Sequence, residues 1–164
     1  MSNLGKMSEN TNKKSYNIIF NSQNKISSVT SLSNCTFGMD WSVIPEDQYK
    51  VHFTFVTKVM NLSTTDMGII NVNLGSTTVF QASNKTSAIT TNFLGISKPY
   101  IISTTSYLLS EDNTNPPIYI HSRPSDTFVN IIINGADNST LFAPTTGSMV
   151  DWVLHMQLVP VGCE

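Results

Sequence analysis

The chain has few charged residues and few cysteines. Lys and Arg number 9 and Asp and Glu 11 in 164 residues, so charged side chains make up 12%, about half of the roughly 25% usual in soluble domains. A net charge of -2 offers nucleic acid no general electrostatic attraction. The two cysteines, Cys35 and Cys163, belong to no CxxC or Cys/His cluster. They predict free thiols in a reducing compartment.

Signatures of membrane insertion and of catalysis are missing as well. No apolar run reaches membrane length, and residues 1–14 lack the apolar centre of a signal peptide, so we expect synthesis in the cytoplasm and no membrane insertion. His52, His121 and His155 show no metal-ligand spacing. The acidic residues stand singly or in turns, and no nucleophile elbow or phosphate loop occurs. We therefore expect no enzyme, no metal and no cofactor.

Uncharged polar residues fill the positions that charged residues usually occupy. The chain holds 17 Asn, 21 Ser and 19 Thr. A surface of this kind repels neighbouring copies only weakly, which suits a protein that packs against itself or a partner. An ordinary soluble β-protein with a Ser/Thr-rich surface would have the same composition.

Two segments show the clearest periodicity. Residues 49–59 place apolar side chains at alternate positions, with polar ones between them apart from Val56 and Thr57, and residues 150–158 repeat the pattern. Because successive side chains of a strand point to opposite faces, each segment predicts a strand with one buried face. The first buried face comprises Tyr49, Val51, Phe53, Phe55 and Val59, and the second Val150, Trp152, Leu154, Met156 and Leu158.

Eight further β-rich runs lie between turn signals such as Lys98-Pro99, and no window has a sustained helical period. The runs are 16–20, 25–32, 36–44, 69–80 with a break at Gly75, 88–96, 100–109, 117–121 and 127–134. This pattern predicts an all-β, antiparallel two-sheet sandwich. A single jelly roll of about eight strands over residues 15–164 fits the length best, preceded by a flexible or extended arm at residues 1–14.

Three basic residues are candidates for a subunit interface. The arm ends in Lys13 and Lys14, which could contact a neighbouring copy or an acidic partner. Arg123 is the single arginine of the chain, and its planar guanidinium suits a fixed two-point contact. The alternatives are a passive terminus and a surface turn residue.

Several segments resemble one family of viral proteins. They are Ile19-Phe20-Asn21-Ser22-Gln23-Asn24, Trp41-Ser42 with residues 49–55, residues 117–124 leading to 128–131, and Trp152-Val153-Leu154-His155-Met156-Gln157-Leu158. Together they resemble the small single jelly-roll capsid proteins of large icosahedral DNA viruses of algae and protists, the giant viruses among them, over roughly residues 15–161.

The resemblance implies a structural protein of the virion, made in the host cytoplasm. It would be a penton that fills fivefold vertices as a homopentamer, or a minor capsid protein. Its partners would be itself and other capsid proteins, without nucleic acid. The alternative is a receptor- or glycan-binding jelly-roll head, as in a trimeric fibre tip or a protein like tumour necrosis factor.

Overall fold

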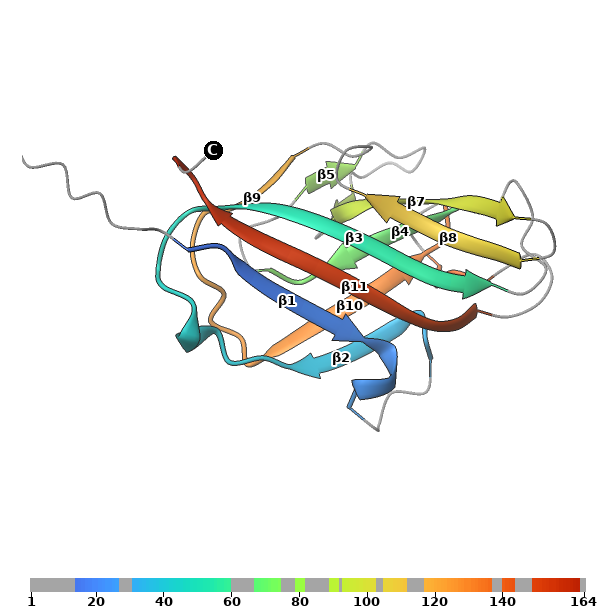
Figure 1. The fold of residues 1–164 in the computed structure, drawn as a ribbon, viewed down its shortest axis with the longest axis horizontal. Coiled ribbons are helices and arrows are strands. Elements are labelled where there is room, and N and C mark those ends of the chain that lie inside the picture. Colours follow the sequence, from blue (N-terminus) through green and yellow to red (C-terminus); the bar gives the residue numbers. More distant parts are fainter. Residues whose placement is uncertain are drawn as a thin grey trace, which may run out of the picture.

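The chain is all-β in the computed structural model (Figure 1). The structure describes residues 14–26, 31–59, 67–74, 79–81, 89–91, 93–102, 105–111, 117–136, 140–143 and 149–162. Within these ranges the only helical segments are two short 3-10 turns, so the all-β prediction is confirmed. None of the described helical turns is long and apolar enough to cross a membrane.

Eleven strands and two turns follow one another in the described residues. They are β1 (Tyr16–Asn21), η1 (Ser22–Asn24), β2 (Asn34–Gly38), η2 (Trp41–Val43), β3 (Tyr49–Val59), β4 (Gly68–Val72), β5 (Val79–Gln81), β6 (Ile89–Thr91), β7 (Phe93–Ile102), β8 (Thr105–Glu111), β9 (Ile118–Ile120), β10 (Phe128–Asn134) and β11 (Met149–Pro160).

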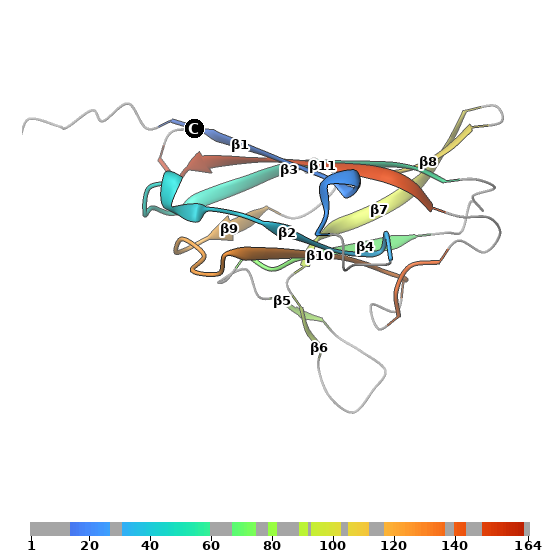
Figure 2. The same cartoon turned by 90° about the horizontal axis from the view of Figure 1, so that it is seen from below.

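Nine of the strands form one antiparallel sheet that folds over on itself. Its order is β1-β11-β3-β8-β7-β4-β10-β2, with β9 paired to β3 beside β8. Figure 2 shows β1, β11 and β3 in one layer and β2, β10 and β4 in the other. β7 joins the layers, because its first half pairs with β4 and its second half with β8. β5 and β6 form a separate two-stranded ribbon.

The strand pairs are nested along the chain. The innermost pair is β4 with β7, followed outward by β3 with β8, β2 with β10, and β1 with β11. Three further pairings, β11 with β3, β10 with β4 and β7 with β8, connect these nested pairs to one another. Strands far apart in the sequence are therefore neighbours in space, and β11 lies in the middle of its layer (Figure 1).

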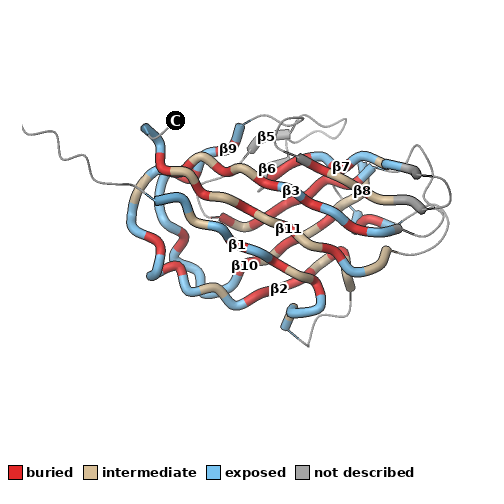
Figure 3. The backbone as a smooth tube through the Cα atoms, viewed as in Figure 1, coloured by how far each residue is buried: buried red, intermediate tan, exposed pale blue. Residues whose placement is uncertain are grey.

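The core lies between the two layers. The predicted apolar positions from Tyr49 to Phe55 in β3 and from Trp152 to Leu158 in β11 are buried, and burial alternates along these strands in Figure 3. The rings of Phe37 in β2 and Phe55 in β3 each lie 5.8 Å from the Trp152 ring. Trp152 therefore links side chains from both layers.

Two residues, Thr57 in β3 and Val150 in β11, depart from the expected alternation of burial, and their contacts explain why. Thr57, which interrupts the apolar alternation of β3, is buried, and its hydroxyl donates to the Val150 carbonyl at 3.0 Å. Val150 was expected on the buried face but is only half-buried. The pairing of β11 with β3 shifts register between Met149 and Trp152, which turns Val150 away from the alternation.

Three boundaries from the sequence patterns were wrong. The run 36–44 ends as a strand at Gly38, and its second half contains η2. The run 25–32 is no strand at its described positions, residues 25–26 and 31–32. The expected turn at Lys98-Pro99 is a continuous part of β7, where the strand changes partner from β4 to β8. A proline costs little there, because the ladder is interrupted at the change of partner.

Gly68 of β4 provides a test of the packing between strands. A Cβ at this position would lie 2.6 Å from the Ser97 hydroxyl and 3.1 Å from the Ile133 side chain. The Ser97 hydroxyl is buried and donates to the Gly68 carbonyl at 3.0 Å, so it cannot turn away without losing this bond. We expect Gly68→Ala to lower the free energy of unfolding by about 1–3 kcal/mol. Gly38→Ala, where no atom lies within 4 Å, should be nearly neutral in the same urea titration.

Asp151 connects β11 to the turn that follows β1. Its carboxylate accepts from the Gln23 amide at 2.7 Å and from the Ser22 hydroxyl at 3.0 Å, and these hydrogen bonds hold the pKa of Asp151 below its ordinary value. A pKa that is lowered in the folded state stabilises the fold above the unfolded pKa of ~3.9, and this contribution is lost as pH falls through the folded pKa. Urea unfolding of wild type and Asp151→Asn should therefore differ at pH 7 and converge in acid. An equal difference at both pH values would contradict this role.

Candidate functional site

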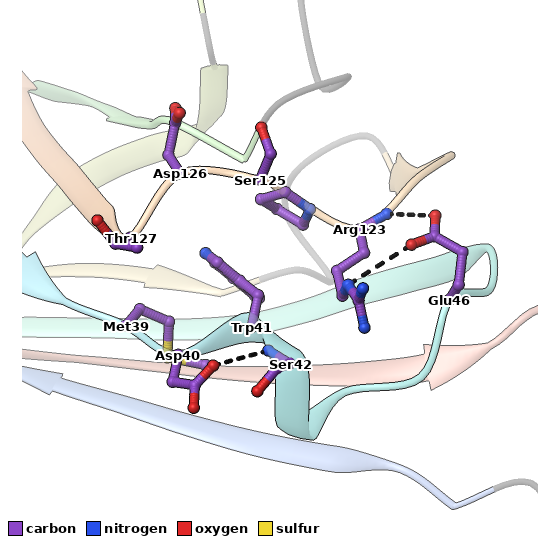
Figure 4. A pocket seen from close by; sticks show the side chains of 10 residues that line it. Met39, Asp40, Trp41, Ser42, Glu46, Arg123, Ser125, Asp126 and Thr127 are labelled. Carbon is purple, nitrogen blue, oxygen red and sulfur yellow. Dashed lines mark hydrogen bonds and ion pairs between the residues drawn. The ribbon is translucent and has the colours of Figure 1, made fainter.

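A hollow opens between η2 and the connection from β9 to β10 (Figure 4). Its volume is about 390 Å³, within the roughly 300–1,000 Å³ of small-molecule sites. The Met39 amide donates to the Thr127 carbonyl at 2.9 Å, which brings the two walls together. The lining residues are Met39, Asp40, Trp41, Ser42, Glu46, Arg123, Pro124, Ser125, Asp126 and Thr127.

Arg123 closes one end of the hollow. Its backbone N–H donates to Glu46 Oε1 at 2.9 Å, its Nη1 donates to the Ile44 carbonyl at 3.1 Å, and its Nε lies 3.5 Å from Glu46 Oε2. The guanidinium thus makes a fixed contact of the kind its planar shape favours, here within the chain. Lys14 is exposed just before β1, and Lys13 lies outside the described residues. The interface role of all three residues stays a prediction.

The Arg123 contacts should stabilise the fold modestly. The side chains of Arg123 and Glu46 are 36% and 61% exposed, so water screens their ion pair. We expect Arg123→Ala to reduce the free energy of unfolding by about 1 kcal/mol, measured by urea titration. Arg123→Lys should recover only part of the loss, because an ammonium cannot reach both partners in the same geometry. If the urea midpoint of Arg123→Ala is the same as that of wild type, the contacts of Arg123 with Ile44 and Glu46 do not stabilise the fold. Lys58→Ala, which removes an exposed cation elsewhere, is the control and should leave the midpoint unchanged.

Trp41 forms the floor of the hollow. The residue is 5% exposed, and its indole Nε1 has no hydrogen-bond partner among the described residues. The other indole is satisfied, since Trp152 Nε1 donates to the Leu32 carbonyl at 2.7 Å. In Figure 4 the nitrogen end of the Trp41 ring points toward the segment from Ser125 to Thr127. Trp41 is therefore a buried donor without a partner in the wall of the hollow.

The ring is held in place by the turn that contains it. The Asp40 side chain accepts from the Ser42 backbone N–H at 2.9 Å and caps η2. Hydrogen bonds from the side chain and backbone of Ser42 keep the pKa of Asp40 below its ordinary value. Asp40 is therefore a carboxylate at neutral pH.

Charge and hydrogen-bonding capacity are mixed along the walls. Asp40, Glu46 and Asp126 contribute three carboxylates against the single guanidinium of Arg123, a formal charge of -2. Asp126 also accepts from the Asn73 amide at 3.4 Å. Hydroxyl groups line the hollow too, so donors and acceptors both face it. Such a surface can bind a polar molecule that offers both kinds of group.

The sequence analysis singled out Arg123 but not the residues around it. Asp40-Trp41-Ser42 could have been recognised as a turn, because an Asp side chain often accepts a hydrogen bond from the backbone N–H two residues later. None of the three histidines lines the hollow: His155 lies on β11 with its Nε2 3.0 Å from Asn17 Oδ1, His52 lies on β3, and His121 directly follows β9. The part of the chain that the structure describes holds no group of three or more His, Cys, Asp or Glu residues placed to bind a metal ion.

No family model matches the chain, and no curated protein matches it.

Proposed function

We propose that this protein is a structural protein of a virion, built as a single two-sheet jelly roll that associates with copies of itself and with other capsid proteins. A penton homopentamer is the simplest form, and a minor capsid protein is the other.

Strand order is the observation that carries the proposal. A long antiparallel hairpin that rolls up on itself gives two four-stranded layers with nested pairs, which is the jelly roll of viral capsid and lectin domains. The orders β1-β11-β3-β8 and β2-β10-β4-β7 agree with that scheme, and the additional pairings of β7 with β8 and of β9 with β3 join the strands into one continuous sheet. The ribbon of β5 and β6 lies between β4 and β7 in the sequence and can be read as an insertion. Because jelly rolls serve several functions, surface properties must supply the remaining support.

The surface supports self-association. Among the residues that the structure describes, four large apolar side chains are more than half exposed: Ile19 at 68%, Val43 at 67%, Phe128 at 56% and Tyr100 at 53%. The low overall charge allows such a surface to be desolvated at a modest cost. Apolar exposure combined with weak charge repulsion is what association between copies requires.

The edge strand β1 is the best candidate for the contact between copies. It ends the strand order and contains neither charge nor proline, the usual means by which an edge strand is protected. The other terminal strand, β2, is partly covered, because the Ile26 amide donates to its Thr36 carbonyl at 2.9 Å. We infer that a second copy lies along β1 and covers Ile19.

The mass of the purified protein tests the proposal. Light scattering across a concentration series should give a discrete oligomer whose mass persists at high salt, because salt screens exposed charge pairs but not apolar contacts. Five copies would favour the penton, and three would favour the alternative of a receptor- or glycan-binding head. A strict monomer at high concentration would contradict self-assembly.

A further inference from the structure

We propose that the hollow beneath Arg123 binds a neutral, hydroxyl-rich ligand the size of one sugar residue. Trp41 and Arg123 would donate hydrogen bonds to it, and Asp40 and Asp126 would accept them. This function goes beyond the proposed capsid role, because assembly of the chain requires no small ligand.

The Trp41 indole is the strongest argument for a ligand. A buried donor without a partner is costly, and nearly all buried N–H groups have one. The ring is 5% exposed and its nitrogen points toward the Ser125–Thr127 wall of the hollow (Figure 4), so a ligand oxygen that enters there would supply the missing acceptor. The nitrogen itself exposes less than 1 Å², so a neighbouring side chain must move slightly to admit that oxygen.

The walls select the class of ligand. A formal charge of -2 repels anions, since three carboxylates face one guanidinium. A simple amine would pair with the carboxylates but would offer no acceptor to Trp41. A hydroxyl group both donates and accepts, so it can satisfy the indole and a carboxylate within one small molecule. The Arg123 guanidinium has five N–H groups, more than its contacts with Ile44 and Glu46 use.

The size of the hollow agrees with this choice. About 390 Å³ lies near the lower end of small-molecule sites, which suits one ring with its hydroxyl groups better than an extended polymer. Pro124 and Met39 add apolar surface for the faces of such a ring. One sugar residue at the end of a glycan, or a free monosaccharide, would present the same groups.

The two tryptophans provide an internal control for the experiment. The chain contains Trp41 and Trp152 only, so ¹⁵N-labelled protein gives two indole N–H signals in a proton–nitrogen correlation spectrum. Trp41→Phe assigns them. We would titrate the 164-residue chain with the methyl glycosides of glucose, galactose, mannose and N-acetylglucosamine. N-acetylneuraminic acid serves as the anionic probe and n-butylamine as the cationic probe.

We expect at least one neutral glycoside to shift the Trp41 signal in a saturable manner. The Trp152 signal should stay in place, because its N–H is bonded to Leu32 in the core. The proposal is overturned if no glycoside moves the Trp41 signal at about 50 mM, where a site with a millimolar dissociation constant is nearly saturated. It is also overturned if only the acid or only the amine binds, or if both indole signals move together.

Variants then test the roles of the residues. Ligand-observed saturation transfer should show roughly two- to tenfold weaker binding in Trp41→Phe, the loss of one hydrogen bond, with the Trp152 signal reporting an intact core. Asp126→Asn should also weaken binding. Val43→Ala, on the same turn but exposed, is the matched control and should bind as wild type does. Unchanged affinity in folded Trp41→Phe would show that the indole does not face the ligand.

Discussion

Trp152→Asp is expected to abolish the folded, soluble protein. Trp152 is 1% exposed and packs on the rings of Phe37 and Phe55, so the change removes a large ring from the centre of the core. Truncation of a buried aromatic costs about 3–5 kcal/mol, and burial of an unpaired carboxylate adds to it. The sum approaches the total stability of a typical domain, about 5–15 kcal/mol. Soluble yield and a thermal unfolding transition measure the effect.

Two control variants separate the effect of the buried charge from a general effect of mutation on this strand. Gln157→Ser lies on the same strand but on its outer face, and it should leave the unfolding transition nearly unchanged. Trp152→Phe should fold with reduced stability, because it keeps an aromatic ring but loses the indole hydrogen bond to Leu32. Equal tolerance of Trp152→Asp and Gln157→Ser would mean that the two faces of β11 are assigned wrongly.

The sequence predicted those elements in which burial alternates. β3 and β11 have one face in the core and one in water, so apolar and polar residues alternate along them in the sequence. β4 was harder to place, because all five of its residues are buried and its side chains show no alternation. Strand order was beyond prediction, since partners such as β1 and β11 are joined by contacts that leave no local pattern.

The candidate site shows the same limit. Arg123 stood out by its chemistry, but its partners Ile44 and Glu46 lie nearly eighty positions away in the sequence. Trp41 had no assigned role in the sequence patterns, and only the structure distinguishes it from Trp152 by the missing partner of its indole. A site assembled from loops is specified by the fold that brings the loops together, not by spacing along the chain.

Ile19→Lys is expected to break self-association while leaving the fold intact. Ile19 is 68% exposed on the edge strand β1, so the lysine side chain can remain in water in the single chain. In an assembly that covers this edge, the change loses about 1.5–3 kcal/mol of apolar burial and adds a charge that must be desolvated. The dissociation constant between copies should rise at least tenfold, as measured by light scattering over a dilution series.

Thr54→Lys is the matched control for the edge. Ile19 pairs with His155 and His155 with Thr54, so the same charge is placed in the same row of the sheet, but on β3 instead of the edge. Thr54 is exposed, and its replacement should leave both the fold and the oligomer unchanged. If both variants dissociate the oligomer, the outer face of the sheet is the contact and not the β1 edge. If neither variant dissociates the oligomer, the copies meet elsewhere, because a second copy that covered the β1 edge would have to bury the lysine of Ile19→Lys.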